Sequence, residues 1–158
     1  MNHLDIFRNC KNIFIGGSSA GSYLAMMLYF NKSCLAKYGL SCKDFSGFIF
    51  DAGQPTAHYN VLRERNIDSR KAIIDETVPM YYIEEYSKEP PVLILVADHD
   101  LPCRYEQNML LISTMKNFNY PENIISYRLM ENSEHCSYNQ DSEFGDIVLN
   151  FIDDLTVV

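Results

Sequence analysis

Four short apolar runs alternate with helical patterns along the chain. The runs cover residues 12–15, 47–50, 92–97 and 124–130, and their length and their content of β-branched and aromatic residues predict strands. The first three are almost continuously apolar, which is typical of strands covered on both faces. The fourth alternates larger apolar residues with Ser126 and Arg128, which favours a half-exposed strand nearer a sheet edge.

Helical patterns follow three of these runs. Residues 20–38 are rich in Leu, Ala and Met before Gly39, and a second helix is expected over residues 105–118, ending before Pro121. The last pattern repeats at the spacing of an amphipathic helix, with Asp141 or Ser142 as its cap. Its apolar positions are Phe144, Ile147, Val148, Phe151, Ile152 and Leu155.

The order of these elements predicts one α/β domain over residues 1–158. Strands alternating with helices indicate right-handed crossovers and a parallel sheet with helices on both faces. Residues 51–91 are long for a simple connection. They contain a helical section at 59–74 and are punctuated by Pro55 and Pro79, and we interpret them as a cap-like insert over the strand ends.

Composition narrows the class of protein. With 47% hydrophobic residues the chain can bury a core, and its net charge of −8 argues against a nucleic-acid partner. No basic amphipathic helix suggests a membrane surface, and no apolar run approaches the length of about 20 residues that spans a bilayer. Five cysteines, an odd number without a C-x-x-C pair, favour a reducing compartment, and we expect a cytoplasmic protein.

The first strand runs into Gly17-Ser18-Ser19-Ala20-Gly21, a G-x-S-x-G motif between strand and helix. This spacing holds the central serine in a strained turn with its hydroxyl free, and the glycines leave room for strand and helix to meet. Ser19 is the candidate nucleophile, and the Ala20 N–H is a candidate oxyanion donor. Phosphate binding is a weaker reading, because neither G-x-G-x-x-G nor G-K-[ST] is present. A plain tight turn is the other alternative.

A serine nucleophile needs a base, and His135 has the best position among the four histidines. It follows the fourth strand, where catalytic groups of parallel sheets gather, whereas His3, His58 and His99 lie before the fold, in the insert and after the third strand. The order serine, acid, histidine then predicts His135 as the base.

The acid partner is less determined. Asp100, which stands slightly beyond the end of the third strand, is preferred over Asp98 and Asp51. Asp98 is then expected to orient its loop. A zinc site is the rival interpretation, although no recognised ligand spacing occurs. Its ligands would come from Asp98, His99, Asp100, Cys103, His135 and Cys136.

These segments together resemble the α/β-hydrolase superfamily, closest to the acetyl esterases and hormone-sensitive-lipase-like carboxylesterases. The matching stretches are GGSSAGS at residues 16–22, IDETVP at 74–79, VLILVADHD at 92–100 and EHC at 134–136. The resemblance implies a partial α/β-hydrolase fold and a carboxylesterase without a cofactor. Ser19 would be the nucleophile, Asp100 the acid, His135 the base and Ala20 an oxyanion donor. The implied substrates are small acyl or acetyl esters.

The chain also departs from that family, since one strand alone precedes Ser19 and no H-G-G-G-type oxyanion segment occurs. It resembles the second half of a hydrolase. We therefore expect either a homo-oligomer formed through the edge at residues 12–15, or a missing N-terminal half.

Two alternatives to an esterase stay open. One is an inactive remnant that only binds or associates, and the other is a peptidase of the same superfamily. No basic patch is visible in the sequence, which does not favour large anionic substrates. Tyr59, Tyr81, Tyr82 and His58 in the insert either line a pocket or pack the insert on the sheet.

Overall fold

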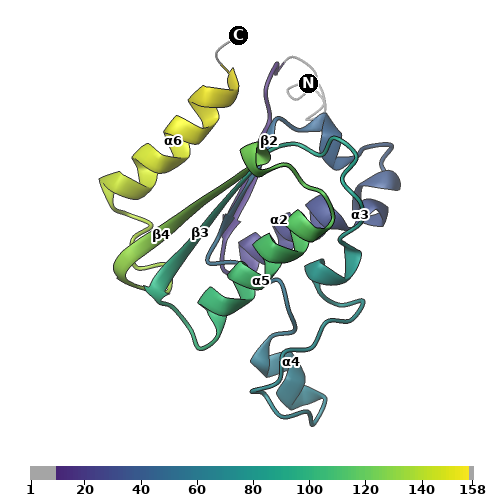
Figure 1. Cartoon of the computed structure of the whole chain (residues 1–158), viewed down its shortest axis with the longest axis vertical. Coiled ribbons are helices and arrows are strands. Elements are labelled where there is room, and N and C mark those ends of the chain that lie inside the picture. The colour runs from purple at the N-terminus through teal and green to yellow at the C-terminus, as the bar shows by residue number, and fades with distance from the viewer. Residues whose placement is uncertain (1–9, 157–158) are drawn as a thin grey trace, which may run out of the picture.

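The computed structural model describes residues 10–156 and contains a four-stranded sheet in the order β1-β2-β3-β4, with every neighbouring pair parallel. The order along the chain equals the order in the sheet, so β1 and β4 are the two edges (Figure 1). The expected fold, four parallel strands with flanking helices, is confirmed. The strands are β1 Phe14–Ser18, β2 Gly47–Asp51, β3 Val92–His99 and β4 Ile125–Glu134.

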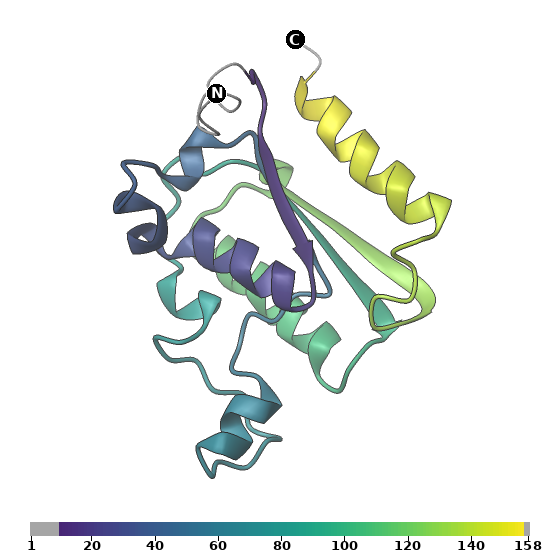
Figure 2. The same cartoon turned by 180° about the vertical axis from the view of Figure 1, so that it is seen from behind.

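Helices cover both faces of this sheet (Figures 1 and 2). One face carries α2 (Ala20–Phe30) and α5 (Arg104–Asn117), and the opposite face carries α6 (Ser142–Thr156). No helix within residues 10–156 has the length and apolar character that crossing a bilayer requires. The shorter helical elements are α3 Lys32–Ala36, α4 Tyr59–Glu64, η1 Cys42–Asp44, η2 Pro79–Tyr82 and η3 Glu122–Ile124.

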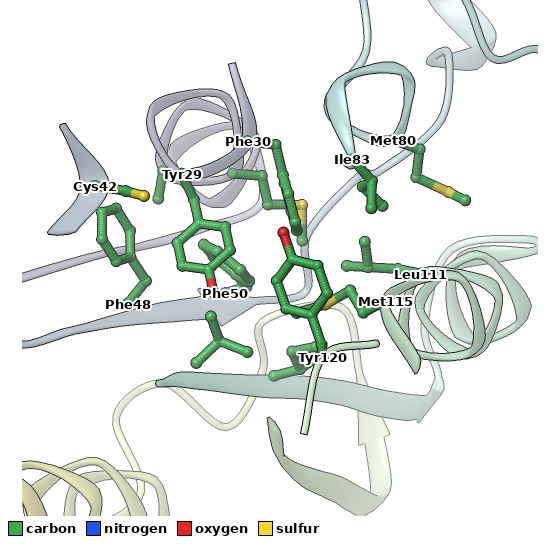
Figure 3. Close-up of a cluster of buried hydrophobic side chains, with 14 of the residues drawn as sticks. Tyr29, Phe30, Cys42, Phe48, Phe50, Met80, Ile83, Leu111, Met115 and Tyr120 are labelled. Carbon is green, nitrogen blue, oxygen red and sulfur yellow. The ribbon is translucent and has the colours of Figure 1, made fainter. Parts of the chain in front are cut away.

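The larger core cluster lies between the sheet and the pair α2 and α5 (Figure 3). Alternate residues of β2, Phe48 and Phe50, point into it because successive side chains of a strand face opposite sides. The Tyr29 ring of α2 meets both of them edge to face, at centroid distances of 5.0 and 5.7 Å. Its hydroxyl donates to the Pro90 carbonyl at 2.9 Å, which satisfies the polar end of a buried side chain.

The second cluster fills the face beneath α6. Ile49, Leu93 and Leu95 of the central strands pack there against the apolar stripe of α6, including Phe151. Because β3 is covered from both sides, residues 92–97 are all buried. This double burial explains why the third apolar run in the sequence is continuous rather than alternating.

The observed elements differ from the expected ones mainly at helix boundaries. The helix expected at 20–38 breaks at Asn31, whose side chain accepts the Ser33 N–H and starts the separate helix α3. In the insert, helix forms over Tyr59–Glu64 rather than up to residue 74. The first strand begins two residues later and ends three residues later than expected, and the fourth continues to Glu134.

The insert between β2 and β3 contains a small apolar cluster of its own, formed by Ala57, Leu62 and Val78. Its helix α4 lies beyond the end of the sheet toward which β1 and β2 run (Figure 1). The insert therefore approaches the edge where the strands carry their carboxyl ends, and this is the edge where the candidate catalytic residues were expected.

Candidate active site

Ser19 occupies the sharp turn between β1 and α2. Its backbone has φ 54° and ψ −114°, a conformation that residues with a side chain rarely adopt. The Ser19 N–H donates to the Asp51 carbonyl at 2.9 Å, which ties the turn to the end of β2. The hydroxyl thus stands at the carboxyl edge of the sheet in front of the N-terminus of α2.

The two motif glycines have different roles. A Cβ on Gly17 would lie 2.5 Å from the carbonyl carbon of Gly21, so the close approach of strand and helix requires glycine at position 17. A Cβ on Gly21 would meet no heavy atom within 4 Å. The expectation that both glycines make room is therefore confirmed for Gly17 and wrong for Gly21, whose backbone is the surface that Gly17 approaches.

The structure brings Ser19, His135 and Asp100 into one chain of hydrogen bonds. His135 Nε2 lies 2.9 Å from Ser19 Oγ, and His135 Nδ1 lies 2.6 Å from Asp100 Oδ1. The Leu101 N–H donates to the same carboxylate oxygen at 2.7 Å. With Nδ1–H donating to Asp100, the lone pair of Nε2 is free to accept the proton of the Ser19 hydroxyl.

Burial differs along this chain of groups. The Asp100 side chain is 1% exposed, whereas the His135 side chain is 23% exposed. A buried carboxylate strengthens its interaction with the imidazole because water screens it less. The partly open histidine and serine remain accessible to a ligand.

The other candidates for acid and base lie elsewhere. His99 is exposed, 3.6 Å from Asp98, and His58 caps α4 by accepting the Asn60 N–H. Asp98 accepts the backbone N–H groups of Asn132 and Ser133, so it orients the end of β4. His3 lies outside the described residues.

Asp51, the third candidate acid, is 1% exposed and accepts a hydrogen bond from the Tyr138 hydroxyl at 2.5 Å. Beside it, the Asn139 amide donates to Ser18 Oγ at 2.9 Å. Burial raises the pKa of Asp51, against the opposing effect of its hydrogen bonds. We call these two bonds, Tyr138 to Asp51 and Asn139 to Ser18, the turn latch, because they hold the His135 turn against the Ser19 elbow.

The turn latch was missed from the sequence. Its visible signal is weak: a tyrosine and an asparagine stand three and four residues after His135, and polar residues flank the ends of β1 and β2. Which of those side chains meet depends on the register between β1 and β2, where Ser18 pairs with Asp51. That register becomes visible once the strands are placed in space.

A second buried anchor fixes the start of the insert. Arg104, 3% exposed, donates to the Ala52 carbonyl and to Gln54 Oε1, both at 3.0 Å. The Asn108 amide donates to the Gly53 carbonyl at 3.0 Å. Burial lowers the pKa of the Arg104 guanidinium, although the nearby charge of Asp100 opposes this.

Ala20 is the first residue of α2 and is exposed. Amides in the first turn of a helix have no acceptor within the helix, and the positive end of the helix dipole lies there. The Ala20 N–H therefore stays the candidate donor to an oxyanion at Ser19.

The zinc alternative lacks a ligand set. Among residues 10–156, no group of three or more His, Cys, Asp or Glu side chains lies together as metal ligands would. Burial raises the pKa of Cys136, next to His135, to about 11, which keeps it a thiol at neutral pH. The site is therefore best described by its serine, imidazole and carboxylate.

A sequence model of the prolyl oligopeptidase family matches residues 4–156. The chain belongs to the prolyl oligopeptidase family. This family match does not extend to the finer resemblance, to acetyl esterases and hormone-sensitive-lipase-like enzymes. No curated protein matches the chain in sequence.

Solved structures share the fold. Acylaminoacyl peptidase from Pyrococcus horikoshii aligns with a TM-score of 0.64 at 13% identity over 95% of this chain and 26% of that one. Esterase 2 from Thermogutta terrifontis aligns with a TM-score of 0.66 at 17% identity, over 91% of this chain and 56% of that one. Dipeptidyl peptidase 4 from Porphyromonas gingivalis aligns with a TM-score of 0.59 at 18% identity, over 90% of this chain and 19% of that one.

These neighbours are α/β-hydrolase proteins, and this chain spans between about a fifth and just over half of their length. At such low identities the likeness shows a common fold alone.

Proposed function

We propose that the chain is a serine hydrolase domain that transfers an acyl group from a small carboxylic ester to water. The observation that carries this proposal is the continuous hydrogen-bonded series from Ser19 Oγ through His135 to the Asp100 carboxylate. Membership of a family of serine hydrolases adds support. The proposal needs no metal or cofactor.

In the proposed reaction, His135 Nε2 accepts the proton of Ser19 while Oγ attacks the ester carbonyl. Asp100 stabilises the resulting imidazolium and holds the ring in the required tautomer. The imidazolium then protonates the departing alcohol. In the second half, His135 takes a proton from water, the hydroxide attacks the acyl-enzyme, and the proton returns to Ser19 Oγ.

The developing oxyanion would accept a hydrogen bond from the Ala20 N–H at the start of α2. Removal of one such donor typically slows an acyl transfer by about 10²–10³-fold. The second donor of a complete oxyanion hole would come from a partner chain or from another part of a longer protein. Without that donor, we expect this chain to be a weak catalyst.

An alkyl fluorophosphonate tests the proposal, because it labels a serine that a neighbouring base activates. We expect labelling of the wild-type chain, none of Ser19→Ala, and a rate at least about a hundredfold lower for His135→Asn. His99→Asn is the matched control, since His99 ends a strand at this edge but is exposed and lies beside Asp98 rather than in the hydrogen-bonded series with Ser19. An unlabelled wild-type chain would instead support a remnant that binds without turnover.

A peptidase is the second candidate function, because the family and two of the three neighbours are named as peptidases. The geometry of Ser19 serves esters and amides alike. Hydrolysis of p-nitrophenyl acetate, compared with that of aminoacyl p-nitroanilides, distinguishes them. Turnover of the anilides at a comparable kcat/KM would contradict the esterase assignment.

A further inference from the structure

A cavity of about 600 Å³ lies between the insert and the start of α5. Its wall includes Leu101 and Pro102, which directly follow Asp100, and Tyr59 of α4. Such a volume is in the range of sites for small molecules. The proposed reaction does not use this space.

The wall of the cavity concentrates positive charge. Four basic side chains, Arg63, Arg70, Lys71 and Arg104, line it together with one carboxylate, Glu106, although the whole chain carries a net charge of −8. In the sequence these residues are spread from position 63 to position 104, which is why no basic patch was visible there. Folding α4 and the following loop toward α5 brings them together.

Two of these cations are available to a ligand. The Arg104 guanidinium is occupied by Ala52 and Gln54, and Arg70 is paired with Asp68. Arg63 lies over the Tyr59 ring at 5.0 Å. Within the described part of the chain, neither Arg63 nor Lys71 forms an ion pair with a carboxylate.

The rest of the wall is largely apolar, and its aliphatic members come from both the insert and the Asp100 loop. They are Ala57, Ala72, Leu101, Pro102 and Leu110. A wall of this kind suits a ligand with an apolar body, while Arg63 and Lys71 suit an acidic group at its end.

One hydrogen bond connects the cavity wall with the catalytic residues. The Leu101 N–H, on the cavity wall, donates to the carboxylate oxygen that also binds His135. The His58 ring lies 4.0 Å, between centroids, from the ring of Tyr59, which lines the cavity. Burial lowers the pKa of His58, and the charges of Arg104, Arg63 and His135 lower it further. The cavity therefore adjoins the site on the side of the insert.

We propose that this cavity is a subsite for a substrate that carries a carboxylate on a short apolar chain, with the carboxylate held by Arg63 and Lys71. The proposal rests on the proposed function, since the ester or amide of the same substrate would lie at Ser19. It names the substrate class that the sequence left open: small molecules with one acidic group, rather than large polyanions.

Binding to the Ser19→Ala chain tests the subsite without any need for turnover. The probes are 4-phenylbutyrate and its uncharged isostere 4-phenylbutanamide, titrated by calorimetry. We expect the carboxylate to bind about fivefold more tightly than the amide, a modest effect because both cations are exposed to water. Arg63→Gln combined with Lys71→Gln should abolish this preference.

The control is Lys37→Gln combined with Lys88→Gln, which removes the same charge from exposed positions outside the cavity. Equal affinity for the two probes in the parent chain would overturn the subsite. An equal loss of preference in the control pair would also overturn it, because it would show a general effect of net charge. Thermal unfolding of each variant confirms that the compared chains are folded.

Failure of the subsite and failure of the proposed function give different results. Fluorophosphonate labelling of Ser19 without any preference for the carboxylate probe refutes the subsite and keeps the hydrolase. A carboxylate preference that depends on Arg63 and Lys71, in a chain that is never labelled, keeps the binding site and refutes the hydrolase.

Discussion

Ser19 keeps its strained backbone because the residues around it leave no alternative. The close approach of the Gly17 Cα to the Gly21 backbone and the bond from the Ser19 N–H to Asp51 fix both sides of the turn. Strain of this kind persists only where the surrounding structure determines it. The reactive position therefore depends on neighbours that take no part in the chemistry.

Gly17→Ala and Gly21→Ala form a matched pair that tests this dependence. Gly17→Ala forces a methyl group against the Gly21 backbone and should lower the free energy of unfolding by about 1–3 kcal/mol, with loss of labelling at Ser19. Gly21→Ala meets nothing and should change stability by at most about 1 kcal/mol, toward greater stability in a helix. Urea unfolding measures both. Equal stabilities of the two variants would show that the close approach is unimportant.

Asp98 provides a pH-dependent contribution at the end of β4. Its carboxylate accepts two backbone N–H groups, from Asn132 first and then Ser133, which lowers its pKa below the ordinary 3.8. A lowered pKa means that the charged form stabilises the fold. This contribution is complete above pH 3.8 and is lost as the pH falls through the lower pKa of the folded state.

We therefore expect Asp98→Asn to lower the Tm at pH 7, and the difference from wild type to shrink as the pH falls below 3.8 through the lowered pKa of Asp98. Glu131→Gln, at an exposed neighbouring position, is the control for loss of one negative charge. Differential scanning fluorimetry across this pH range measures the effect. A difference that stays constant down to pH 2 would exclude the charged form of Asp98 as its source.

The sequence predicted which residue types would meet at this edge of the sheet and ranked Asp100 first among the carboxylates, but it left Asp51 and Asp98 open. Asp51 ends β2, Asp98 lies near the end of β3 and Asp100 follows β3, so strand order alone places all three near His135. The direction of each side chain decides, and it depends on the β2 register and on the irregular pairing of β3 and β4 between Ala97 and His99. Neither feature is encoded in the local pattern.

At the scale of elements, burial on both faces made the apolar runs of the two inner strands, β2 and β3, reliable strand signals. The prediction of one helix over 20–38 was wrong at Asn31. The helix-forming composition continues across this residue, but the Asn31 side chain accepts the Ser33 N–H and starts a new helix. Side chains of this type compete with the backbone for hydrogen bonds. The helix of the insert is also shorter than expected and ends at Glu64, because Asn66 adopts φ 56°, outside the right-handed helical region.

The turn latch joins two elements that are distant in sequence, and Tyr138→Phe tests whether it positions His135. The substitution leaves the buried Asp51 carboxylate without its phenol donor, which should cost about 1–3 kcal/mol of unfolding free energy. If the latch also positions the imidazole, the maximal labelling rate of Ser19 should fall while the concentration of fluorophosphonate at half-maximal rate stays the same.

Tyr81→Phe is the control, because Tyr81 is 56% exposed and lies outside the latch. A purely structural role for Tyr138 would lower stability and leave the labelling rate of the folded fraction unchanged. That result would remove Tyr138 from the positioning residues.

At the scale of the whole molecule, the sheet ends at β1, directly beside the reactive serine. The bonds from Ser46 N–H to Ile13 and from Ser19 N–H to Asp51 show that odd-numbered residues of β1 face β2. By alternation, the N–H and C=O groups of Phe14, Gly16 and Ser18 point outward. Gly16 is exposed in the described chain, so the edge is open to another strand (Figure 2).

We propose that a further strand pairs with this edge, either from a second copy or from the remainder of a longer protein.

For self-association, the outward amide of Gly16 should exchange slowly with deuterium at high protein concentration and quickly after dilution. The inward amide of Gly17 should stay protected in both, as the internal control, because it bonds β2. Sedimentation velocity on the same samples should show the parallel loss of dimer. Fast exchange at Gly16 in a sample that sediments as a dimer would place the dimer contact away from the β1 edge. A folded monomer at all concentrations would contradict pairing of β1 with a second copy.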